Sequence, residues 1–408
     1  MTPSDVRAAA AELVSLHARF APCFGRQEAQ AHSRTYLQGL LAAPGRKSIE
    51  PMALAFGQSQ DEPRQCRVIA LQRFLGSSPW DHEDIQKEIQ RTFAETLVPS
   101  TADWSIGTVG VLDGSTFVKK GIESVGVKRQ YCGRLGKVEN CQAGVFLAGV
   151  TPTGSALLEH QLYLPREWAA DAKRRAKVHV PPEIRFQNQL QIAAALLRRV
   201  RENALVSFDW VVADDGFGRY GEFLDALEEL DQRYLLDVPS DTTVWTEGEV
   251  PAYKGCGRRP RRSRRNAVRS VKAVAESLPP EAWHNYRIRD GALGPLVFAF
   301  AAVRVHAVRH RKEGPAIWLV FRRSLGETAE TKYYVSNASA DTPLETFALV
   351  SGCRCRVEEY FEQGKSYLGM AQYEARSWAA WHHHMSLVAL AHLFVTLTRL
   401  RLKKKTPA

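Results

Sequence analysis

Three acidic residues stand in settings where a carboxylate could do chemistry. Asp113 ends the apolar run Val-Gly-Val-Leu-Asp, and Asp214 ends the run Trp-Val-Val-Ala-Asp. Both runs are predicted to be buried strands, where an isolated charge is costly unless a cation compensates for it. Glu358 lies in a predicted helix together with Arg354 and Lys365. Carboxylates in this arrangement suit a divalent-metal site for phosphodiester chemistry, because such ions prefer oxygen ligands.

The two cations near Glu358 have the spacing of one helix face. Arg354 comes four residues before Glu358, and Lys365 comes seven residues after it. At about 100° per residue, the three side chains would lie on one stripe of a continuous helix. A carboxylate between two cations on one face could hold a metal ion and nearby phosphates together. The alternative is an i,i+4 surface salt bridge beside an incidental lysine.

The sequences around the three acids resemble the DDE-type insertion-sequence transposases that carry a Y-x2-R-x3-E-x6-K signature. Asp113 lies in LDGSTFVKKG, which SVGVKRQYCGRLGKVENCQAGV follows, Asp214 lies in VVADDGFG, and Glu358 lies in RCRVEEYFEQGK. The segment YEARSWAAWHHHMSLVALAHLF at 373–394 is similar to the apolar helix that follows the glutamate in these proteins. The resemblance runs from about 60 to 397, with the three motifs in the family order.

The resemblance implies a ribonuclease H-like catalytic domain with a β-strand insertion before the glutamate. Asp113, Asp214 and Glu358 would then bind two divalent ions, normally magnesium, with manganese as a possible substitute. Such ions activate a water or a DNA 3′-hydroxyl and stabilise the leaving 3′-oxygen. This sequence departs from the signature at Ser351, where the family has tyrosine.

The implied function is a DNA transposase that cleaves element ends and transfers the strands into target DNA. Its partners would be double-stranded DNA, from both the element ends and the target, and a second copy of the chain, since two ends must be paired. Two alternatives stay open. One is a domesticated transposase that acts as a DNA-binding regulator or complex subunit, and the other is a ribonuclease H-like nuclease without strand transfer.

The positive charge is concentrated in two stretches. The net charge is +11, and residues 251–275 hold nine Lys/Arg and no acid, while 399–405 hold five more. Clustered basic residues are the expected footprint of a polyanion partner, although solvated charge runs are the alternative. We expect the first stretch to follow the DNA backbone through its arginines, namely Arg258, Arg259, Arg261, Arg262, Arg264 and Arg265.

Other residues could contact DNA near the reacting phosphate. Lys119 and Lys120 follow Asp113 closely enough to meet backbone phosphates, or they are solvent-exposed turn lysines. Trp245 could stack on an extruded base, as such insertions do in the related enzymes, or it belongs to the core of the insertion. The three histidines His382–His384 are predicted to be core residues, because consecutive residues on a helix point about 100° apart and cannot share one ion.

The elements that must position these residues fall into four expected segments. Residues 1–105 are predicted to be helical and DNA-binding, with Ser4 as the first N-cap and a later helix that begins with a serine cap before Pro79. Residues 106–240 form the first part of the catalytic core, 241–350 a β-rich insertion with a basic loop, and 351–408 the C-terminal helices and basic tail.

The predicted order of elements in the core is β-β-β-α-β-α-β, an α/β fold of the ribonuclease H-like class with a mixed sheet. Its first and fourth strands are neighbours, which would bring Asp113 and Asp214 together. The expected core strands cover 107–112, 143–150, 156–164, 205–213 and 234–238, with helices at 183–201, 353–370 and 375–397. The expected strands of the insertion cover 283–289, 303–308, 316–322 and 332–336.

The composition is that of an ordinary globular protein. Apolar residues make up 45% and charged residues 24% of the 408 residues. The N-terminus has no continuous apolar segment, and the run 293–303 is too short to span a bilayer. We therefore do not expect a membrane protein. The resemblance to insertion-sequence transposases implies a bacterial cytoplasmic protein associated with the nucleoid.

Overall fold

A computed structural model describes residues 2–42, 45–57, 62–99, 105–246, 267–291, 294–326 and 329–405. Contacts divide the chain into two compact units, each assembled from segments that are distant in the sequence. Unit 1 comprises Met1–Trp104, Val111–Ser207 and Cys355–Ala408, and unit 2 comprises Ser105–Gly110 and Phe208–Arg354. The units are described separately.

Unit 1 is built on an antiparallel sheet centred on β3 (Lys137–Val150). The first part of β3 pairs with β2 (Lys128–Cys132) and its second part with β4 (Ser155–Leu162), while β1 (Val109–Val118) is its other neighbour. Strand β1 extends beyond the predicted 107–112, so Asp113 lies within the strand and not at its end. The strand continues because Ser115 and Phe117 alternate inward after the apolar run.

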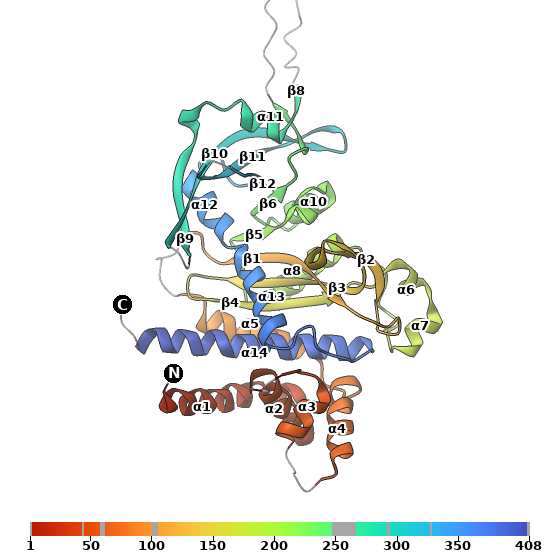
Figure 1. Ribbon diagram of the computed structural model, residues 1–408. Helices are drawn as coiled ribbons and strands as arrows, with labels where there is room; N and C mark the ends of the chain where they lie inside the picture. Colours follow the sequence, from red (N-terminus) through yellow and green to blue (C-terminus); the bar gives the residue numbers. More distant parts are fainter. Residues whose placement is uncertain are drawn as a thin grey trace, which may run out of the picture. The chain divides into compact units, whose positions relative to one another are not determined.

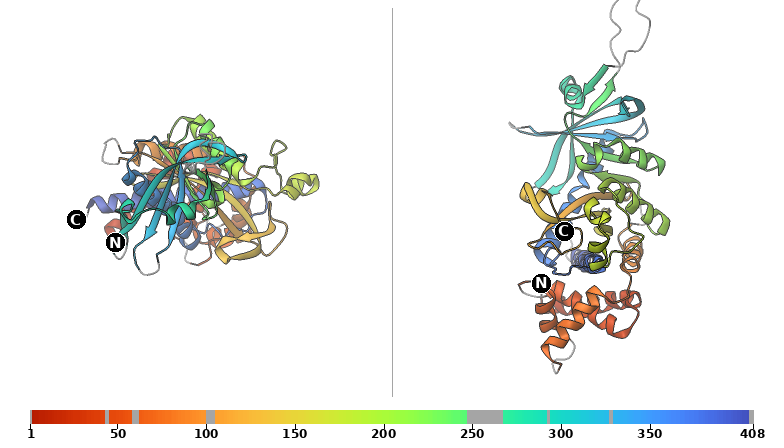
Figure 2. Two further views of the ribbon diagram at one scale, coloured as in Figure 1. Left: turned by 90° about the horizontal axis from the view of Figure 1, so that it is seen from above. Right: turned by 90° about the vertical axis from the view of Figure 1, so that its right-hand side faces the viewer.

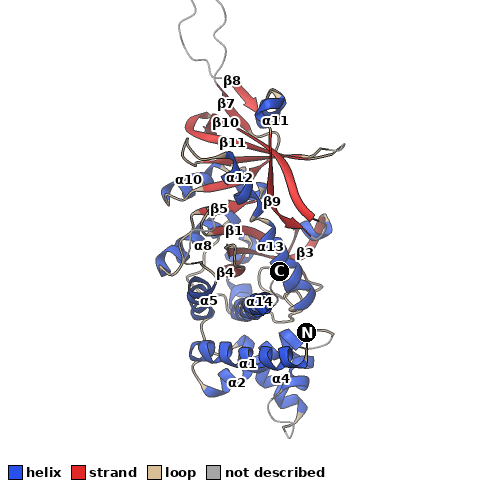
Figure 3. Ribbon diagram, turned by 90° about the vertical axis from the view of Figure 1, so that its left-hand side faces the viewer, coloured by secondary structure: helices blue, strands red, loops and turns tan. Residues whose placement is uncertain are grey.

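Two long helices cover this sheet in unit 1. Helix α14 (Trp378–Lys405) packs against β4 and beside α5 (His82–Thr96). The N-terminal helices lie against the other side of α14, as Figures 1 and 3 show, so α14 is enclosed between two layers. They are α1 (Pro3–Phe20), α2 (Gln27–Ala42), α3 (Ile49–Phe56) and α4 (Arg64–Gly76), with the 3₁₀ turn η1 (Ala21–Phe24).

The position of α14 between two layers explains its apolar sequence. A helix that is hydrophobic all round is a buried helix, and its residues from Trp381 to Leu393 are almost all buried. Within the part of the chain that the structure describes, one helix segment, Trp378–Leu402, is long and apolar enough to cross a membrane, and half of its apolar window is buried inside the protein. The core helix of a soluble protein can have the same length and apolar composition.

Three helices of unit 1 begin at residues other than those predicted. Helix α1 is capped by Thr2 and not by Ser4, since Thr2 and Asp5 form a reciprocal capping box. Helix α5 is capped by Asp81, so Pro79 precedes it. Helix α8 (Gln189–Asn203) starts six residues after the predicted 183, where Asn188 and Gln191 form a second capping box. Unit 1 also contains the short helices α6 (Arg166–Ala170), α7 (Ala172–Lys177) and η2 (Gly133–Leu135).

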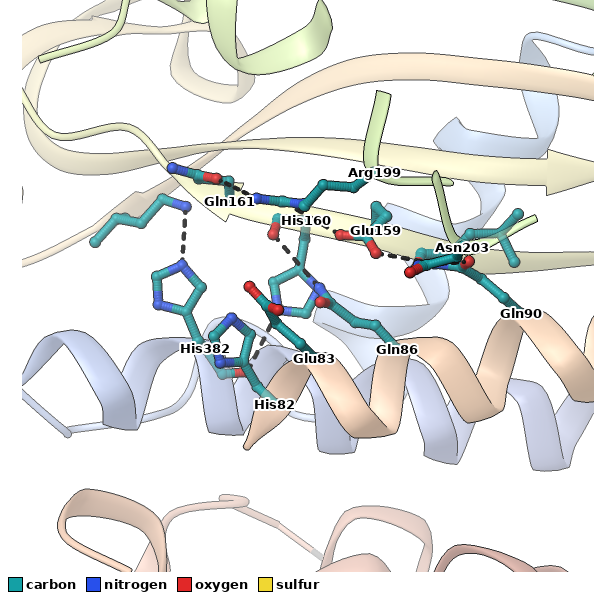
Figure 4. A network of polar contacts seen from close by, with 12 residues as sticks. His82, Glu83, Gln86, Gln90, Glu159, His160, Gln161, Arg199, Asn203 and His382 are labelled. Carbon is teal, nitrogen blue, oxygen red and sulfur yellow. Dashed lines mark hydrogen bonds and ion pairs between the residues drawn. The ribbon is translucent and has the colours of Figure 1, made fainter. Parts of the chain in front are cut away.

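A buried polar network ties α5 and α8 to β4 (Figure 4). Glu159 of β4 pairs with Arg199 of α8 at 3.2 Å and accepts a hydrogen bond from Gln90 of α5 at 2.9 Å. Asn203 donates to the Gln90 amide oxygen at 3.0 Å, and Arg199 donates to Gln161 at 2.9 Å. Because these side chains link three different elements, the network fixes how the two helices pack on the strand.

The three consecutive histidines of α14 are core residues, as predicted. His382, His383 and His384 are all nearly inaccessible to solvent. They contact different partners. His382 Nδ1 lies 3.0 Å from the Trp378 carbonyl, and His384 Nδ1 lies 2.8 Å from the Tyr36 hydroxyl. His383 contacts two main-chain carbonyls, one at the end of α4 and one just before α5. Burial lowers the pKa of all three, so they are neutral anchors.

Unit 2 is built on a second set of paired strands, with more strands than unit 1. Their order is β5 (Trp210–Ala213), β6 (Tyr234–Val238), β12 (Thr331–Ser336), β11 (Lys312–Ser324), β10 (Gly294–Arg309), β7 (Thr243–Thr246) and β8 (Ala267–Ser270), with β9 (His284–Gly291) also on β10. Strands β5 and β6 are parallel, and the remaining pairs are antiparallel. The strands fan out with the usual twist in Figure 2.

The helices of unit 2 are short. Helices α9 (Asp215–Gly218) and α10 (Gly221–Glu229) connect β5 to β6, α11 (Val271–Glu276) and η3 (Pro280–Ala282) precede β9, and α12 (Leu344–Gly352) follows β12. The core strands that the sequence predicts are present as the parallel strands β5 and β6 of unit 2 and as β1, β3 and β4 of unit 1. The mixed α/β fold class is confirmed, and strands β7–β12 give the insertion its β-rich character.

Candidate active site

Asp214 occupies the turn at the end of β5 in unit 2. The buried strand delivers its side chain to the start of α9, where Asp214 is the N-cap residue. Its Oδ1 atom is buried and has no hydrogen-bond partner in the described structure. Burial raises the pKa of this carboxyl, and the nearby Arg354 guanidinium opposes that rise. A buried carboxylate oxygen with an open coordination position fits the donor set that a hard divalent cation takes.

Arg354 is held by a second carboxylate of unit 2. Its Nη1 donates to Asp237 Oδ2 at 3.0 Å, and the two side chains are 22% and 14% exposed. Burial raises the pKa of Asp237 as well, while Arg354 lowers it. Asp237 interrupts the apolar strand β6, so it belongs to the site although we did not single it out from the sequence. The signal was present, because Asp237 follows Tyr-Leu-Leu as Asp214 follows Val-Val-Ala.

The helix expected over 353–370 is present as α13 (Cys355–Tyr367), but it begins one residue after Arg354. Two helices, α12 and α13, are separated by a turn at Cys353 and Arg354. Arg354 therefore does not share a helix stripe with Glu358 and Lys365. The reason is that α12 packs in unit 2, where it buries Phe347 against Trp210 and Trp318, and ends at its C-cap Cys353.

Ser351, at the position of the family tyrosine, lies in α12 and not in the helix of the glutamate. Its side chain is buried, and its hydroxyl donates to the Ala348 carbonyl at 2.8 Å. A serine hydroxyl satisfied by its own helix makes no contact beyond it at this position. The departure from the signature is therefore accommodated within α12.

Unit 1 carries the other two predicted acids. Glu358 is exposed in the first turn of α13, and Asp113 is half-buried within β1. Lys365, in the last turn of α13, lies over the Phe117 and Phe361 rings at 5.5 and 5.7 Å. Burial and Arg134 lower the Lys365 pKa, while Cys132 and, to a smaller extent, Asp113 raise it. Asp113 is therefore within electrostatic reach of the Lys365 ammonium.

Lys119 and Lys120 have different surroundings in unit 1. Lys119 Nζ donates to the Tyr373 carbonyl at 2.9 Å and lies 3.3 Å from the centre of the Tyr373 ring. Burial lowers the pKa of Lys119 to about 7. Lys120 is exposed to solvent. The second lysine is thus the more accessible of the two to a phosphate.

The remaining DNA-contact candidates belong to the insertion. Trp245 is half-buried in β7, opposite His306 of β10, and its buried indole Nε1 has no hydrogen-bond partner in the described structure. The six arginines between 258 and 265 lie outside the described residues.

The three predicted metal ligands come from both units: Asp113 and Glu358 from unit 1, and Asp214 from unit 2. Within the described ranges, no group of three or more His, Cys, Asp or Glu side chains is gathered closely enough to hold a metal ion. The triad therefore stays a prediction, and each member is characterised within its own unit.

Sequence and structure comparisons find related proteins. The chain is 27% identical over 207 residues to a probable transposase for insertion sequence element IS701 from Microchaete diplosiphon, an alignment that covers 50% of this chain and 48% of that protein. The chain thus spans about half the length of the curated relative it matches. The crystal structure of the NurA nuclease from Sulfolobus solfataricus aligns with 60% of this chain over 73% of the nuclease chain, at 9% identity. The TM-score of 0.27 is too low to indicate a shared fold.

The sequence profile of the DDE superfamily endonucleases matches residues 19–295. The match includes Asp113 and Asp214 and ends before Glu358. It covers more than half of the chain, and it agrees with the acidic motifs and with the mixed α/β fold. The chain therefore belongs to the DDE superfamily endonucleases.

Proposed function

We propose that this protein is an insertion-sequence transposase that cleaves the ends of its DNA element and joins them to target DNA. The observation that carries the proposal is the environment of Asp214. Its buried Oδ1 has no hydrogen-bond partner in the described structure and lies beside the Arg354 guanidinium. Membership of an endonuclease family and the likeness to a probable transposase support the same reading.

Asp113, Asp214 and Glu358 would hold two magnesium ions. Bound magnesium would activate the attacking hydroxyl and stabilise the leaving 3′-oxygen. Arg354 favours the ionised form of Asp214, because a nearby cation opposes the rise in pKa that burial causes. Arg354 and Lys365 present positive charge that suits backbone phosphates, as do Lys120 and the six arginines of the basic loop.

The proposed substrate is double-stranded DNA, with two element ends paired by a dimer of the chain. The site of action would be the bacterial nucleoid. Trp245 is proposed to stack on a base at the element end.

An excision assay tests this proposal and needs no defined element ends, because a donor plasmid carries the gene together with its genomic flanks. Purified protein is added to this plasmid with magnesium. We expect the wild type to release the element and to yield joined products with a target plasmid. Asp214→Asn should lower the excision rate by about 100-fold or more, because it removes a ligand charge at the reacting centre.

Asp215→Asn is the matched control, since Asp215 is the exposed neighbour of Asp214. It should retain most of the excision rate. Equal rates for the wild type and Asp214→Asn would refute the catalytic assignment. Cleavage without joined products would reduce the function to that of a nuclease.

A further inference from the structure

Three cations gather around Asp237 on one face of the unit 2 sheet. Tyr334 of β12 is the register partner of Asp237, and Arg322 of β11 is the register partner of Lys332 of β12. Directly opposed residues of an antiparallel pair lie on the same face, as do residues two apart along a strand. Asp237 and Tyr334 therefore lie on the same face as Lys332 and Arg322, in two neighbouring rows across β6, β12 and β11.

The electrostatics of Asp237 agree with this placement. After burial, which raises its pKa, the groups that lower it are Arg354, Lys332 and Arg322 in that order. Asp214 raises the same pKa. Asp237 is thus within electrostatic reach of both Asp214 and the two sheet cations.

The two sheet cations, Arg322 and Lys332, form no ion pair within the described part of the chain. Asp237 is already engaged by Arg354 at 3.0 Å. Within the described ranges, neither Arg322 nor Lys332 has a carboxylate within 4.0 Å. Two half-buried cations that no carboxylate of the described residues contacts can each bind an anion.

Aromatic rings hold Arg322 in place. Its guanidinium lies 4.9 Å from the Phe298 ring centre and 5.8 Å from the Tyr334 ring centre. An arginine that stacks on aromatic rings keeps its fork of N–H donors preorganised for a planar or tetrahedral oxyanion. Lys332 adds a point charge beside it, which is the combination that phosphate recognition uses.

We propose that Arg322 and Lys332 form a contact site for DNA backbone phosphate on the sheet of unit 2, next to Asp214. The proposal rests on the proposed function, because it takes DNA as the substrate. The pair would position the strand beside Asp214 by binding a phosphate other than the one that reacts. Arg322 and Lys332 are therefore positioning residues.

Duplex binding as a function of salt tests the pair. The probe is a fluorescein-labelled duplex of random sequence, and the affinity of the full chain is measured by fluorescence anisotropy over a range of salt concentrations. Each phosphate contact contributes about −0.9 to the slope of log K against log salt concentration. Arg322→Gln or Lys332→Gln should make this slope shallower by about 1, and the double variant by about 2.

Arg323→Gln is the matched control, because Arg323 is the next residue of β11. It points to the opposite face of the sheet, where its guanidinium lies 3.8 Å from the Trp283 ring centre. Its slope should equal that of the wild type, and Arg322→Lys should retain the wild-type slope because it keeps the charge. A thermal melt of each variant identifies any loss of DNA binding that comes from unfolding. If Arg322→Gln is unfolded, the salt slope of Lys332→Gln is compared with that of Arg322→Lys instead.

Different results would overturn the phosphate site and the proposed function on which it rests. A wild type that does not bind the duplex overturns both the DNA substrate and the phosphate site. A wild type that binds, with Arg322→Gln, Lys332→Gln and Arg323→Gln all sharing its salt slope, overturns only the phosphate site. An Asp214→Asn variant that excises normally, while the slopes change as expected, leaves the phosphate site standing and overturns the catalytic assignment.

Discussion

At the scale of single residues, one guanidinium in unit 2 compensates two largely buried carboxylates. Asp214 and Asp237 each carry a burial penalty that raises the pKa, and one guanidinium, that of Arg354, opposes both rises. A carboxylate that shares its cation with a neighbour keeps only part of that compensation. This leaves Asp214 able to gain from a further cation, which is the requirement for a metal ligand.

Removal of Asp237 should destabilise unit 2. Asp237→Ala leaves the Arg354 guanidinium, 22% exposed, without its 3.0 Å carboxylate partner. Breaking a largely buried ion pair from one side costs about 3 kcal/mol in unfolding free energy. Urea unfolding of the wild type and the variant at neutral pH measures the change. Glu374→Ala is the control, since the Arg46–Glu374 pair is 63% and 60% exposed and should add little.

The two lysines after β1 should differ in DNA binding. Lys119 is engaged by the main-chain carbonyl and ring of Tyr373, whereas Lys120 is exposed. We expect Lys120→Gln to reduce duplex affinity and to make the salt slope shallower by about 1, while Lys119→Gln leaves the slope unchanged. Fluorescence anisotropy against salt concentration is the measurement. The opposite result would mean that Lys119 leaves Tyr373 when DNA binds.

At the scale of elements, the approach of α9 to β6 sets the position of Asp214. Gly218 ends α9, and a Cβ atom there would lie 2.1 Å from the Asp237 carbonyl oxygen. Main-chain atoms of a central strand cannot yield as a flexible side chain can. The glycine therefore permits the helix that follows Asp214 to pack directly on the strand that carries Asp237.

Gly218→Ala should separate α9 from β6. The clash with main chain is expected to cost about 2–3 kcal/mol in unfolding free energy and to lower the excision rate, since Asp214 caps the displaced helix. Gly221→Ala is the control, because its nearest contact is the flexible Arg309 side chain at 3.5 Å. Urea unfolding and the donor-plasmid assay report the two effects. Equal stability of both variants would contradict the close approach.

At the scale of the whole molecule, buried histidines couple folding to pH. Burial is the main cause that lowers the pKa of His82 to about 4, of His384 to about 3 and of His392 to about 4. Below about pH 6.5 the unfolded chain binds protons at these histidines and the folded chain does not, so acid destabilises the fold. Glu159 acts in the opposite direction, because burial raises its pKa to about 7. Between that pH and the lower pKa of an unfolded glutamate, the folded chain binds a proton that the unfolded chain does not, so acid stabilises the fold through this group.

The histidines should prevail, and stability should fall between about pH 7 and about pH 5. A histidine with a folded pKa of about 4 loses about 2 kcal/mol over that range. His392→Leu removes one such contribution, so its stability should fall by about 2 kcal/mol less than that of the wild type over the same range. Urea unfolding at the two pH values checks this. A variant as acid-sensitive as the wild type would show that His392 is not protonated on unfolding.

Local patterns in the chain were enough to find most elements and the acidic motifs. Apolar runs identified β3, β4, β5 and β6. Such patterns depend on neighbours within a few positions, which the sequence contains. Helix starts were less well predicted, because several residues near each start could serve as the cap and only the folded backbone selects Thr2, Asp81 and Asn188.

Tertiary structure decided which of the recognised charges act together. The spacing of Arg354 and Glu358 fits one helix, yet a turn separates them and Arg354 pairs with Asp237, 117 residues away. Strand register, in turn, set Arg322 opposite Lys332 on the face of Asp237. Helical periodicity describes a helix only as far as the helix extends, and a pairing between distant strands leaves no local pattern. The sequence alone thus indicates which acidic residues could bind a metal ion, while the tertiary structure determines which cations lie beside them.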